Sequence, residues 1–298
     1  MGKETVKQKS KSGPDFILVG ATRSGTSTLY EALKKHPFIF VTEQKEIQFF
    51  MRDHLYSKGL EWYQQYFVTA PENTAKGEIC PIYMEKGIRI GTSQQHIYDP
   101  DEDCATRIRK IYPDIKLIFS LRHPIERAQS NFWKSVWTGS EPCSTFDEAV
   151  KEELQGKREP EKHRLCYLYR SRYETHLTHW LNLFPRNNIL ITIFDCWTTQ
   201  PATAIKDIES HLNVKTAGMT ASDILHYNEG RSIDSKLLKK AVKPFRHIRL
   251  FRAFQRRVTR KGYQEMRPQT RQKLLDYFAL DTEYIEKQIG FDLPEWRR

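Results

Sequence analysis

Short runs of apolar residues recur along the chain and indicate strands. Three of them, at residues 16–19, 115–121 and 189–194, are mostly apolar throughout, which is typical of strands buried on both faces of a parallel sheet. Two further stretches, at 38–41 and 77–83, predict short strands. Five strands of this kind are enough for a buried central sheet.

Between these runs, apolar residues recur at helical spacing. The pattern predicts helices over 26–35, 105–112, 145–154, 167–184, 204–212 and 270–288, and two more in 235–260, which Pro244 separates. Strands that alternate with helices predict an α/β fold with a mostly parallel sheet wrapped by helices. Residues 1–13 are polar and basic and predict a disordered tail, and with no evident linker beyond them we expect 14–298 to form a single domain.

The first strand leads into a loop that suits a phosphate. The sequence FILVGATRSGTSTL places Gly20 and Gly25 after the strand and small hydroxyl residues where the helix begins. Such a loop directs backbone N–H groups and the positive end of a helix dipole at one point. The alternative is an ordinary glycine turn between a strand and a helix.

The same spacing occurs in the nucleotide-binding P-loop, but the match is incomplete. Thr26 stands where that motif has lysine, and the cation of the loop is Arg23. No clear aspartate follows to help to hold magnesium. A P-loop kinase that acts on a small metabolite is therefore a competing hypothesis that lacks its two expected residues.

A second candidate phosphate site follows the strand at 115–121. Arg122 comes directly after it, and Ser130 lies two turns into the next helix, which begins near Pro124. Ligands of open α/β sheets bind beyond the carboxyl ends of the strands, so an arginine and a hydroxyl placed there could hold a phosphate. An arginine that hydrogen-bonds loop carbonyls is the alternative.

A third candidate site is the pair Lys45 and Glu46, which immediately precedes Ile47, Phe49 and Phe50. A carboxylate at the edge of an aromatic core can serve as a general base. The alternative is a surface ion pair at the end of a strand or helix.

Charge and composition narrow the class of protein. Thirteen lysines and arginines but only two acidic residues lie between 231 and 267, a local excess equal to the +11 net charge of the whole chain. Such a segment suggests an anionic partner or a solvated helix face. The five cysteines show no metal-ligand spacing, no run is long enough to span a membrane, and the first dozen residues lack the apolar stretch of a signal peptide. We therefore expect a cytoplasmic protein with reduced cysteines and no metal site.

Taken together, these motifs resemble the sulfotransferases that use 3′-phosphoadenosine 5′-phosphosulfate, in particular the branch with the heparan sulfate sulfotransferases and their bacterial relatives. FILVGATRSGTSTL resembles their 5′-phosphosulfate loop, LIFSLRHPIERAQSNF their 3′-phosphate motif, KEIQFF the segment with their catalytic glutamate, and the Lys-Gly pair in RKGY their late loop. The terminal GFDLPEW is similar as well. The resemblance covers nearly the whole chain from Pro14 to Trp296.

The resemblance implies the P-loop-like sulfotransferase fold, adenosine 3′,5′-bisphosphate as the donor product, and no need for metal. It implies that Glu46 is the general base and that Arg23 and Lys45 assist at the sulfuryl group. The implied donor-binding residues are Arg23, Ser24, Gly25, Thr26, Ser27, Thr28, Arg122, Ser130, Arg260, Lys261 and Gly262.

Two departures from the family pattern bear on the acceptor. Arg23 replaces the usual loop lysine and keeps its charge, whereas Ile79 stands where the heparan enzymes carry a second lysine. No cysteine pair matches the disulfide of the secretory enzymes. We therefore expect a small-molecule acceptor, namely a bacterial natural product with a hydroxyl or an amine. A heparan-type saccharide is the alternative acceptor.

Two other functions are further alternatives. One is a basic nucleic-acid-binding protein, but no nucleic-acid motif is present. The other is an inactive sulfotransferase-like binding module, but Glu46, Arg122 and Ser130 argue for an active enzyme.

Overall fold

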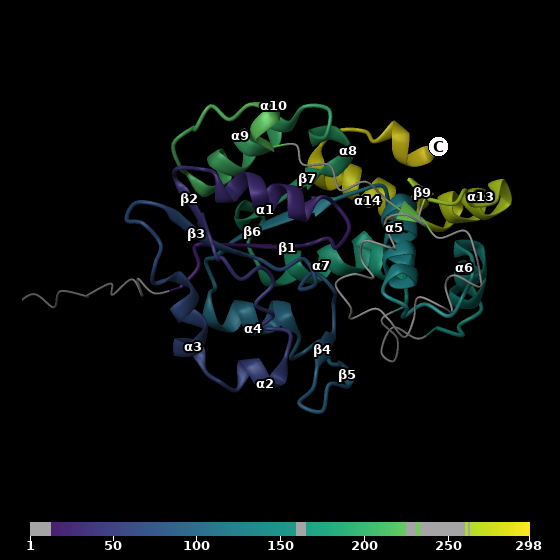
Figure 1. Cartoon of the computed structure of the whole chain (residues 1–298), viewed down its shortest axis with the longest axis horizontal. Helices are drawn as coiled ribbons and strands as arrows, with labels where there is room; N and C mark the ends of the chain where they lie inside the picture. Colours follow the sequence, from purple (N-terminus) through teal and green to yellow (C-terminus); the bar gives the residue numbers. More distant parts are fainter. Residues whose placement is uncertain (1–12, 159–164, 225–230, 233–259, 262) are drawn as a thin grey trace, which may run out of the picture.

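The computed structural model describes residues 13–158, 165–224, 231–232, 260–261 and 263–298. Its centre is a sheet of five parallel strands in the order β2-β3-β1-β6-β7 (Figure 1). The strands are β1 (Phe16–Gly20), β2 (Ile39–Val41), β3 (Ala75–Ile79), β6 (Lys116–Leu121) and β7 (Ile189–Ile193). All five lie within or next to the apolar runs, so the predicted parallel α/β sheet is confirmed.

Helices cover both faces of the sheet because side chains alternate along each strand. Phe16 and Leu18 of β1 belong to one apolar cluster, and Ile17 and Val19 belong to the other. The first cluster is completed by α1 (Thr26–Lys34), α9 (Pro201–Leu212) and α10 (Ala221–Ile224). The second is completed by α3 (Leu60–Gln64), α4 (Cys104–Ile111), α7 (Tyr173–Leu183) and α14 (Ala279–Ile289) (Figure 1).

A third apolar cluster lies beyond the carboxyl end of β6. It joins α5 (Pro124–Trp137), α6 (Phe146–Leu154) and α13 (Pro268–Tyr277). Helix α5 begins with proline directly after the strand, as the sequence predicted, and Thr145 and Glu148 form a capping box that begins α6. The remaining elements are α2 (Asp53–Tyr56), α8 (Phe194–Trp197), 3-10 turns at Gln65–Phe67, Arg186–Asn188 and Pro294–Arg297, and the antiparallel pairs β4 (Ile88–Ile90) with β5 (His96–Tyr98) and β8 (Arg231–Ser232) with β9 (Arg260–Lys261).

Two predicted helices are each broken in the structure. The pattern over 167–184 becomes a 3-10 turn (Tyr169–Ser171) followed by α7, and the final helix divides into α13 and α14 at Phe278. The cause is the same in both places, because the two parts bury their apolar residues in different clusters. Tyr167 and Leu274 pack with α5, whereas Leu177 and Ile285 pack against the sheet. The helices predicted within 235–260 lie outside the described residues.

The described part of the chain contains no helix with the length and apolar composition that crossing a bilayer requires. In those same residues, no three His, Cys, Asp or Glu side chains are grouped so that they could hold a metal ion. None of the five cysteines is in a disulfide.

Candidate active site

Gly25 shapes the loop between β1 and α1. Its φ of 75° and ψ of 7° are left-handed values that residues with a side chain rarely adopt. A Cβ atom there would lie 2.4 Å from Phe194 Cδ2 and 2.5 Å from Trp197 Cζ2, so close packing against α8 also requires glycine. The start of α1, whose first N–H groups have no partner within the helix, is thereby held beyond the ends of β1 and β7.

The neighbouring strand β6 holds both ends of this loop. The Ser120 backbone oxygen accepts a hydrogen bond from Ala21 N (2.7 Å), and the Ser120 hydroxyl donates to the Ser24 backbone oxygen (2.7 Å). Ser120 and Ser24 are both fully buried. Their hydrogen bonds stabilise the loop in one conformation before any ligand binds, which is the preorganisation that a phosphate cradle requires.

Arg23 joins the first predicted motif to the second. This exposed residue has a φ of 72°, and its Nε donates a 3.0 Å hydrogen bond to Ser130 Oγ on α5. Ser130 Oγ also lies 2.9 Å from the Tyr263 hydroxyl. The structure therefore brings together two predicted site residues that are 107 positions apart in the chain.

Arg122 lies at the carboxyl end of β6, as predicted. Its guanidinium carbon is 5.1 Å from the centre of the Phe194 ring, the same ring that packs against Gly25. The Tyr173 hydroxyl holds the Arg122 backbone by donating to its oxygen (2.8 Å). The buried Arg122 Nε has no hydrogen-bond partner within the described parts of the chain, which leaves a cationic donor available to an anion.

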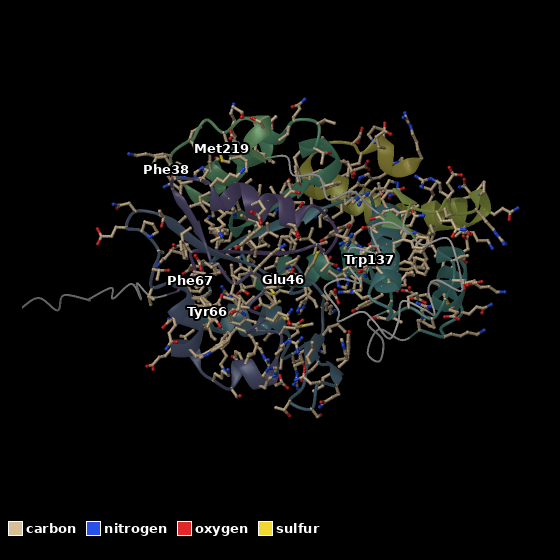
Figure 2. All side chains as sticks on the ribbon, viewed as in Figure 1. Phe38, Glu46, Tyr66, Phe67, Trp137 and Met219 are labelled. Carbon is tan, nitrogen blue, oxygen red and sulfur yellow. The ribbon has the colours of Figure 1, made fainter. Side chains whose placement is uncertain are left out.

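Lys45 and Glu46 lie beside the start of α1. The Lys45 ammonium donates a 2.6 Å hydrogen bond to Ser27 Oγ, so the predicted third site adjoins the phosphate loop. Burial lowers the pKa of Lys45, and the nearby carboxylates of Glu46 and Glu31 oppose this shift. Glu46 is half-buried, and its backbone N–H donates to the Ile79 oxygen at the end of β3 (3.2 Å). Figure 2 shows Glu46 near the middle of the molecule.

Comparison with known proteins identifies the family. A family model described as a sulfotransferase domain matches residues 13–282. The chain belongs to the sulfotransferase family. It is 25% identical over 299 residues to a bifunctional heparan sulfate N-deacetylase/N-sulfotransferase 1 of Xenopus laevis, a match that covers 96% of this chain and 31% of that protein. A heparan sulfate glucosamine 3-O-sulfotransferase 5 of Mus musculus is 27% identical over 201 residues, 67% of this chain and 54% of that protein. The chain thus spans about a third of the length of the first relative and about half of the second.

A solved structure confirms the fold of this sulfotransferase. The crystal structure of a sulfotransferase from Alicyclobacillus acidocaldarius superposes with a TM-score of 0.68 and covers 96% of this chain and 99% of its own, at 24% identity. At this identity the likeness shows the fold alone. The predicted sulfotransferase fold is therefore confirmed, as the predicted family is by the family model.

Arg127 also contacts the candidate site, although the sequence alone did not single it out. This fully buried side chain donates to Ser171 Oγ (2.6 Å), the Tyr167 backbone oxygen (2.7 Å) and Thr22 Oγ1 (3.3 Å). Burial lowers its pKa to about 10, so it remains charged at neutral pH. Arg127 connects the phosphate loop to the segment at 165–171. Its position inside the RHPIERAQS motif was the available signal, but a second arginine in a helix usually lies on the surface.

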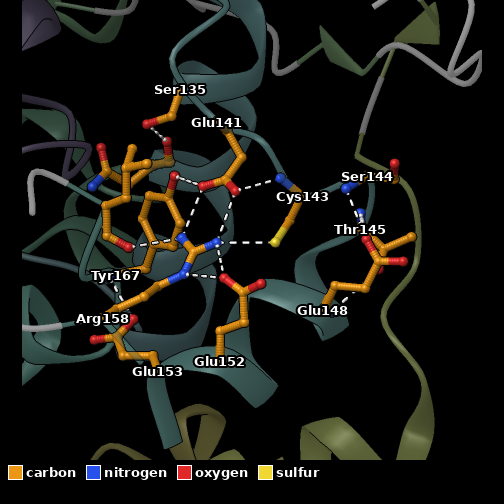
Figure 3. Close-up of polar contacts among 12 residues, drawn as sticks. Ser135, Glu141, Cys143, Ser144, Thr145, Glu148, Glu152, Glu153, Arg158 and Tyr167 are labelled. Carbon is orange, nitrogen blue, oxygen red and sulfur yellow. Dashed lines mark hydrogen bonds and ion pairs between the residues drawn. The ribbon is translucent and has the colours of Figure 1, made fainter. Parts of the chain in front are cut away.

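The segment that Arg127 contacts is itself held by a polar cluster (Figure 3). Arg158 forms two parallel hydrogen bonds with the buried carboxylate of Glu141, of 2.9 and 2.8 Å, and a third with Glu152. The Tyr167 hydroxyl donates to Glu141 as well. Although burial opposes the shift, the hydrogen bond from Arg158 holds the pKa of Glu141 below its ordinary value. The cluster fixes Tyr167 and hence the carbonyl oxygen that Arg127 uses.

The predicted late loop is described only in part. Arg260 and Lys261 form β9, which pairs with β8, and β8 contacts α5, the helix that carries Ser130. Gly262 and most of the basic segment at 231–267 lie outside the described residues, so the predicted roles of both remain predictions. Tyr263, which follows directly, contacts Ser130.

The carboxyl-terminal motif docks at the same end of the sheet. Asp195 Oδ2 accepts hydrogen bonds from Trp296 Nε1 (3.0 Å) and from the His123 backbone N–H (2.9 Å). The Trp296 ring also packs against Tyr173, with ring centroids 5.9 Å apart. The motif therefore supports the segment that carries Arg122.

A cavity of about 150 Å³ is lined in part by residues that follow Glu46 in the chain. It is lined by polar and charged side chains from Gln48, Arg52, Glu85, His96, Tyr169 and Arg170, and by apolar residues that include Met51 and Ile82. Gln48 is two residues from Glu46. Ile79 is buried and supplies no cation, and the arginines that line this cavity are Arg52 and Arg170.

Proposed function

We propose that this sulfotransferase moves a sulfuryl group from 3′-phosphoadenosine 5′-phosphosulfate to a hydroxyl or an amine of a small acceptor, with Glu46 as the general base. The observation that carries the proposal is the convergence of three separate motifs on the loop after β1. Arg23 hydrogen-bonds Ser130, and Lys45 hydrogen-bonds Ser27. Family membership supports the reaction class.

The residues present fit this donor. The loop around Gly25 and the start of α1 would hold the 5′-phosphate, with Arg23 and the residues Ser24, Thr26, Ser27 and Thr28. Arg122 and Ser130 would hold the 3′-phosphate, because the Arg122 Nε is buried and without a partner in the part of the chain that the structure describes. Arg260, Lys261 and Gly262 would cover the nucleotide. The 3′-phosphate distinguishes this donor from ATP, so the 3′-phosphate site would set the donor specificity.

When bound, the donor supplies a sulfuryl group on a good leaving group, and the protein contributes positioning and charge stabilisation. Glu46 accepts the proton of the acceptor hydroxyl or amine as its oxygen or nitrogen forms a bond to sulfur. Arg23 and the loop N–H groups stabilise the charge that develops on the 5′-phosphate oxygen as its bond to sulfur breaks. Lys45 stabilises the sulfuryl oxygens.

The cavity beside Gln48 supports a small acceptor. Its volume of about 150 Å³ suits one compact group, and its mixed charges suit an acceptor that carries both polar and apolar parts. The names of the relatives support the alternative, a heparan-type saccharide. An acceptor screen separates the small-molecule proposal from the saccharide alternative. Small alcohols, phenols and amines are assayed beside N-desulfated heparan oligosaccharides, and release of adenosine 3′,5′-bisphosphate is measured for each. Turnover confined to the oligosaccharides would overturn the small-acceptor proposal.

Donor recognition is tested by calorimetric titration with adenosine 3′,5′-bisphosphate, and with ATP in parallel. We expect the bisphosphate to bind at micromolar concentration or below and ATP to bind much more weakly. Replacing Arg122 with alanine should weaken the bisphosphate about tenfold to a hundredfold and hardly affect an analogue without the 3′-phosphate. Lys110→Ala, on the exposed part of α4, is the control. Equal losses for both nucleotides in Arg122→Ala would contradict the assignment of the 3′-phosphate site.

The general base is tested by Glu46→Gln. The variant should lose about a hundredfold or more in turnover and keep its affinity for adenosine 3′,5′-bisphosphate, because the amide has nearly the same shape but does not accept a proton. Glu43→Gln, an exposed residue of the same loop, is the matched control and should retain activity. Wild-type turnover in Glu46→Gln would remove Glu46 from the mechanism.

A further inference from the structure

Lys45 reaches the phosphate loop from a part of the sheet that is not adjacent to it. Its segment follows β2, an edge strand that β3 separates from β1. Neighbouring strands lie about 5 Å apart, so the end of β2 is about 10 Å from the end of β1. The position of the Lys45 ammonium therefore depends on what holds the residues between β2 and Lys45.

Helix α1 holds these residues through Tyr30. The side chain of Tyr30 is buried, and its hydroxyl lies 3.1 Å from the Thr42 backbone oxygen and 3.0 Å from the Glu43 backbone oxygen. A hydroxyl has a single hydrogen to donate, which Tyr30 shares between these two carbonyl oxygens. Residues 42–43 are thereby attached to α1, and Lys45 follows two residues later.

The same face of α1 receives the Lys45 ammonium. Ser27 and Tyr30 are three positions apart on the helix, so their side chains are neighbours on its surface. The Lys45 Nζ donates to Ser27 Oγ (2.6 Å) and lies 5.6 Å from the centre of the Tyr30 ring, a distance at which an aromatic ring attracts a cation. Tyr30 thus contacts the segment twice, with its hydroxyl at the backbone and with its ring at the ammonium.

We propose that Tyr30 is the positioning residue for Lys45: its hydroxyl attaches residues 42–43 to α1, and its ring holds the ammonium beside Ser27 in the first turn of the helix. This inference rests on the proposed role of Lys45, which is to stabilise the sulfuryl oxygens. A long lysine side chain loses much conformational freedom when it is fixed. An ammonium that is in place before the donor binds therefore contributes more to the reaction than one that is ordered during it.

The decisive variant is Tyr30→Phe. It keeps the ring and the packing of α1, and it removes only the donor to the Thr42 and Glu43 oxygens. The matched control is Tyr284→Phe on α14, where the hydroxyl accepts a hydrogen bond from Thr178 Oγ1 on α7 (2.8 Å). The control also removes one tyrosine hydroxyl that connects two elements, but on the opposite face of the sheet from α1.

Hydrogen exchange followed by mass spectrometry tests the attachment of the segment and needs no ligand. A peptide covering 41–46 should exchange about fivefold faster in Tyr30→Phe, because one hydrogen bond of ordinary strength is lost. Tyr284→Phe should leave the exchange of this peptide unchanged. Exchange at the wild-type rate in Tyr30→Phe would overturn the inference.

Hydrolysis of the sulfuryl donor by water, measured as released adenosine 3′,5′-bisphosphate, tests the effect on Lys45 and needs no acceptor. Tyr30→Phe should lower kcat about fivefold and leave the donor KM unchanged, because Lys45 acts on the sulfuryl group. Tyr284→Phe should keep both values. In a Lys45→Ala background, Tyr30→Phe should cause no further loss of kcat.

A purely structural role of Tyr30 would lower kcat by the same factor with and without Lys45, or would not lower it at all. Either result would overturn the inference. Wild-type kcat in Lys45→Ala would instead refute the proposed role of Lys45, and failure of the wild type to bind adenosine 3′,5′-bisphosphate would refute the proposed function. In both of these cases the exchange measurement still tests the attachment of the segment to α1.

Discussion

Replacing Gly25 with alanine should separate two energetic costs that a side chain at this position of the loop between β1 and α1 would combine. The first is conformational, because alanine at a φ of 75° is less stable than glycine by about 1–2 kcal/mol. The second is steric, because the new Cβ would lie 2.4 Å from Phe194 and 2.5 Å from Trp197. Crowding of this kind in a packed region costs about 1–3 kcal/mol. We expect Gly25→Ala to lower the free energy of unfolding by about 2–5 kcal/mol.

Gly290 provides the matched control. It ends α14 with a φ of 81° and a ψ of 17°, and a Cβ there would meet no atom within 4 Å. Gly290→Ala should therefore show the conformational cost alone, about 1–2 kcal/mol. Equilibrium denaturation in urea measures both variants, and the difference between them is the steric term.

The steric term should also appear in ligand binding. Phe194 contacts both the Gly25 position and the Arg122 guanidinium, so an alanine that displaces its ring should weaken adenosine 3′,5′-bisphosphate in calorimetry. In the background of Phe194→Ala, Gly25→Ala should cost less than in the wild type, since part of the obstruction is gone. Equal losses of stability in Gly25→Ala and Gly290→Ala, or no coupling to Phe194, would refute the packing argument.

Three further predictions concern buried charge. Burial raises the pKa of Glu78 from 4.5 to about 7, so its contribution to stability is complete below pH 4.5 and is lost as the pH rises through 7. Relative to Glu78→Gln, the wild type should lose about 2.5 kcal/mol of unfolding free energy between pH 5 and pH 8, and a pH-independent difference would contradict this. Burial lowers the pKa of His176 from 6.5 to about 4. The contribution of neutral His176 to stability is therefore present above pH 6.5 and is lost as the pH falls through 4. Acid denaturation should show that the wild type loses up to about 3 kcal/mol of unfolding free energy relative to His176→Gln. Arg127→Lys keeps the charge but loses the forked guanidinium that reaches Ser171 and the Tyr167 oxygen. It should destabilise the protein by about 2 kcal/mol and weaken the binding of adenosine 3′,5′-bisphosphate. Unchanged affinity would show that Arg127 does not support the loop between β1 and α1.

The candidate site was predicted best where function depends on neighbours in sequence. The loop at Gly25 and the arginine at the end of β6 follow directly from a strand, and the Lys45–Glu46 pair directly precedes an apolar and aromatic run. Both kinds of signal are readable from the sequence. Arg127, Tyr263 and Glu78 were missed because their partners are distant in sequence. The sequence around Glu78 reads as an ordinary strand, and nothing in it indicates that the hydroxyls of Tyr63 and Tyr83 converge there.

The sequence by itself determined the sheet, its parallel sense and the family, because mostly apolar runs separated by helical patterns permit few other arrangements and short motifs resemble those of the family. Only the tertiary structure decided where helices break and which polar groups meet. The breaks before α7 and at Phe278 occur because successive turns bury their side chains in different clusters. The meeting of Arg23 with Ser130 depends on β1 lying next to β6. Burial and long-range hydrogen bonds are properties of the packed chain, and local periodicity does not contain them.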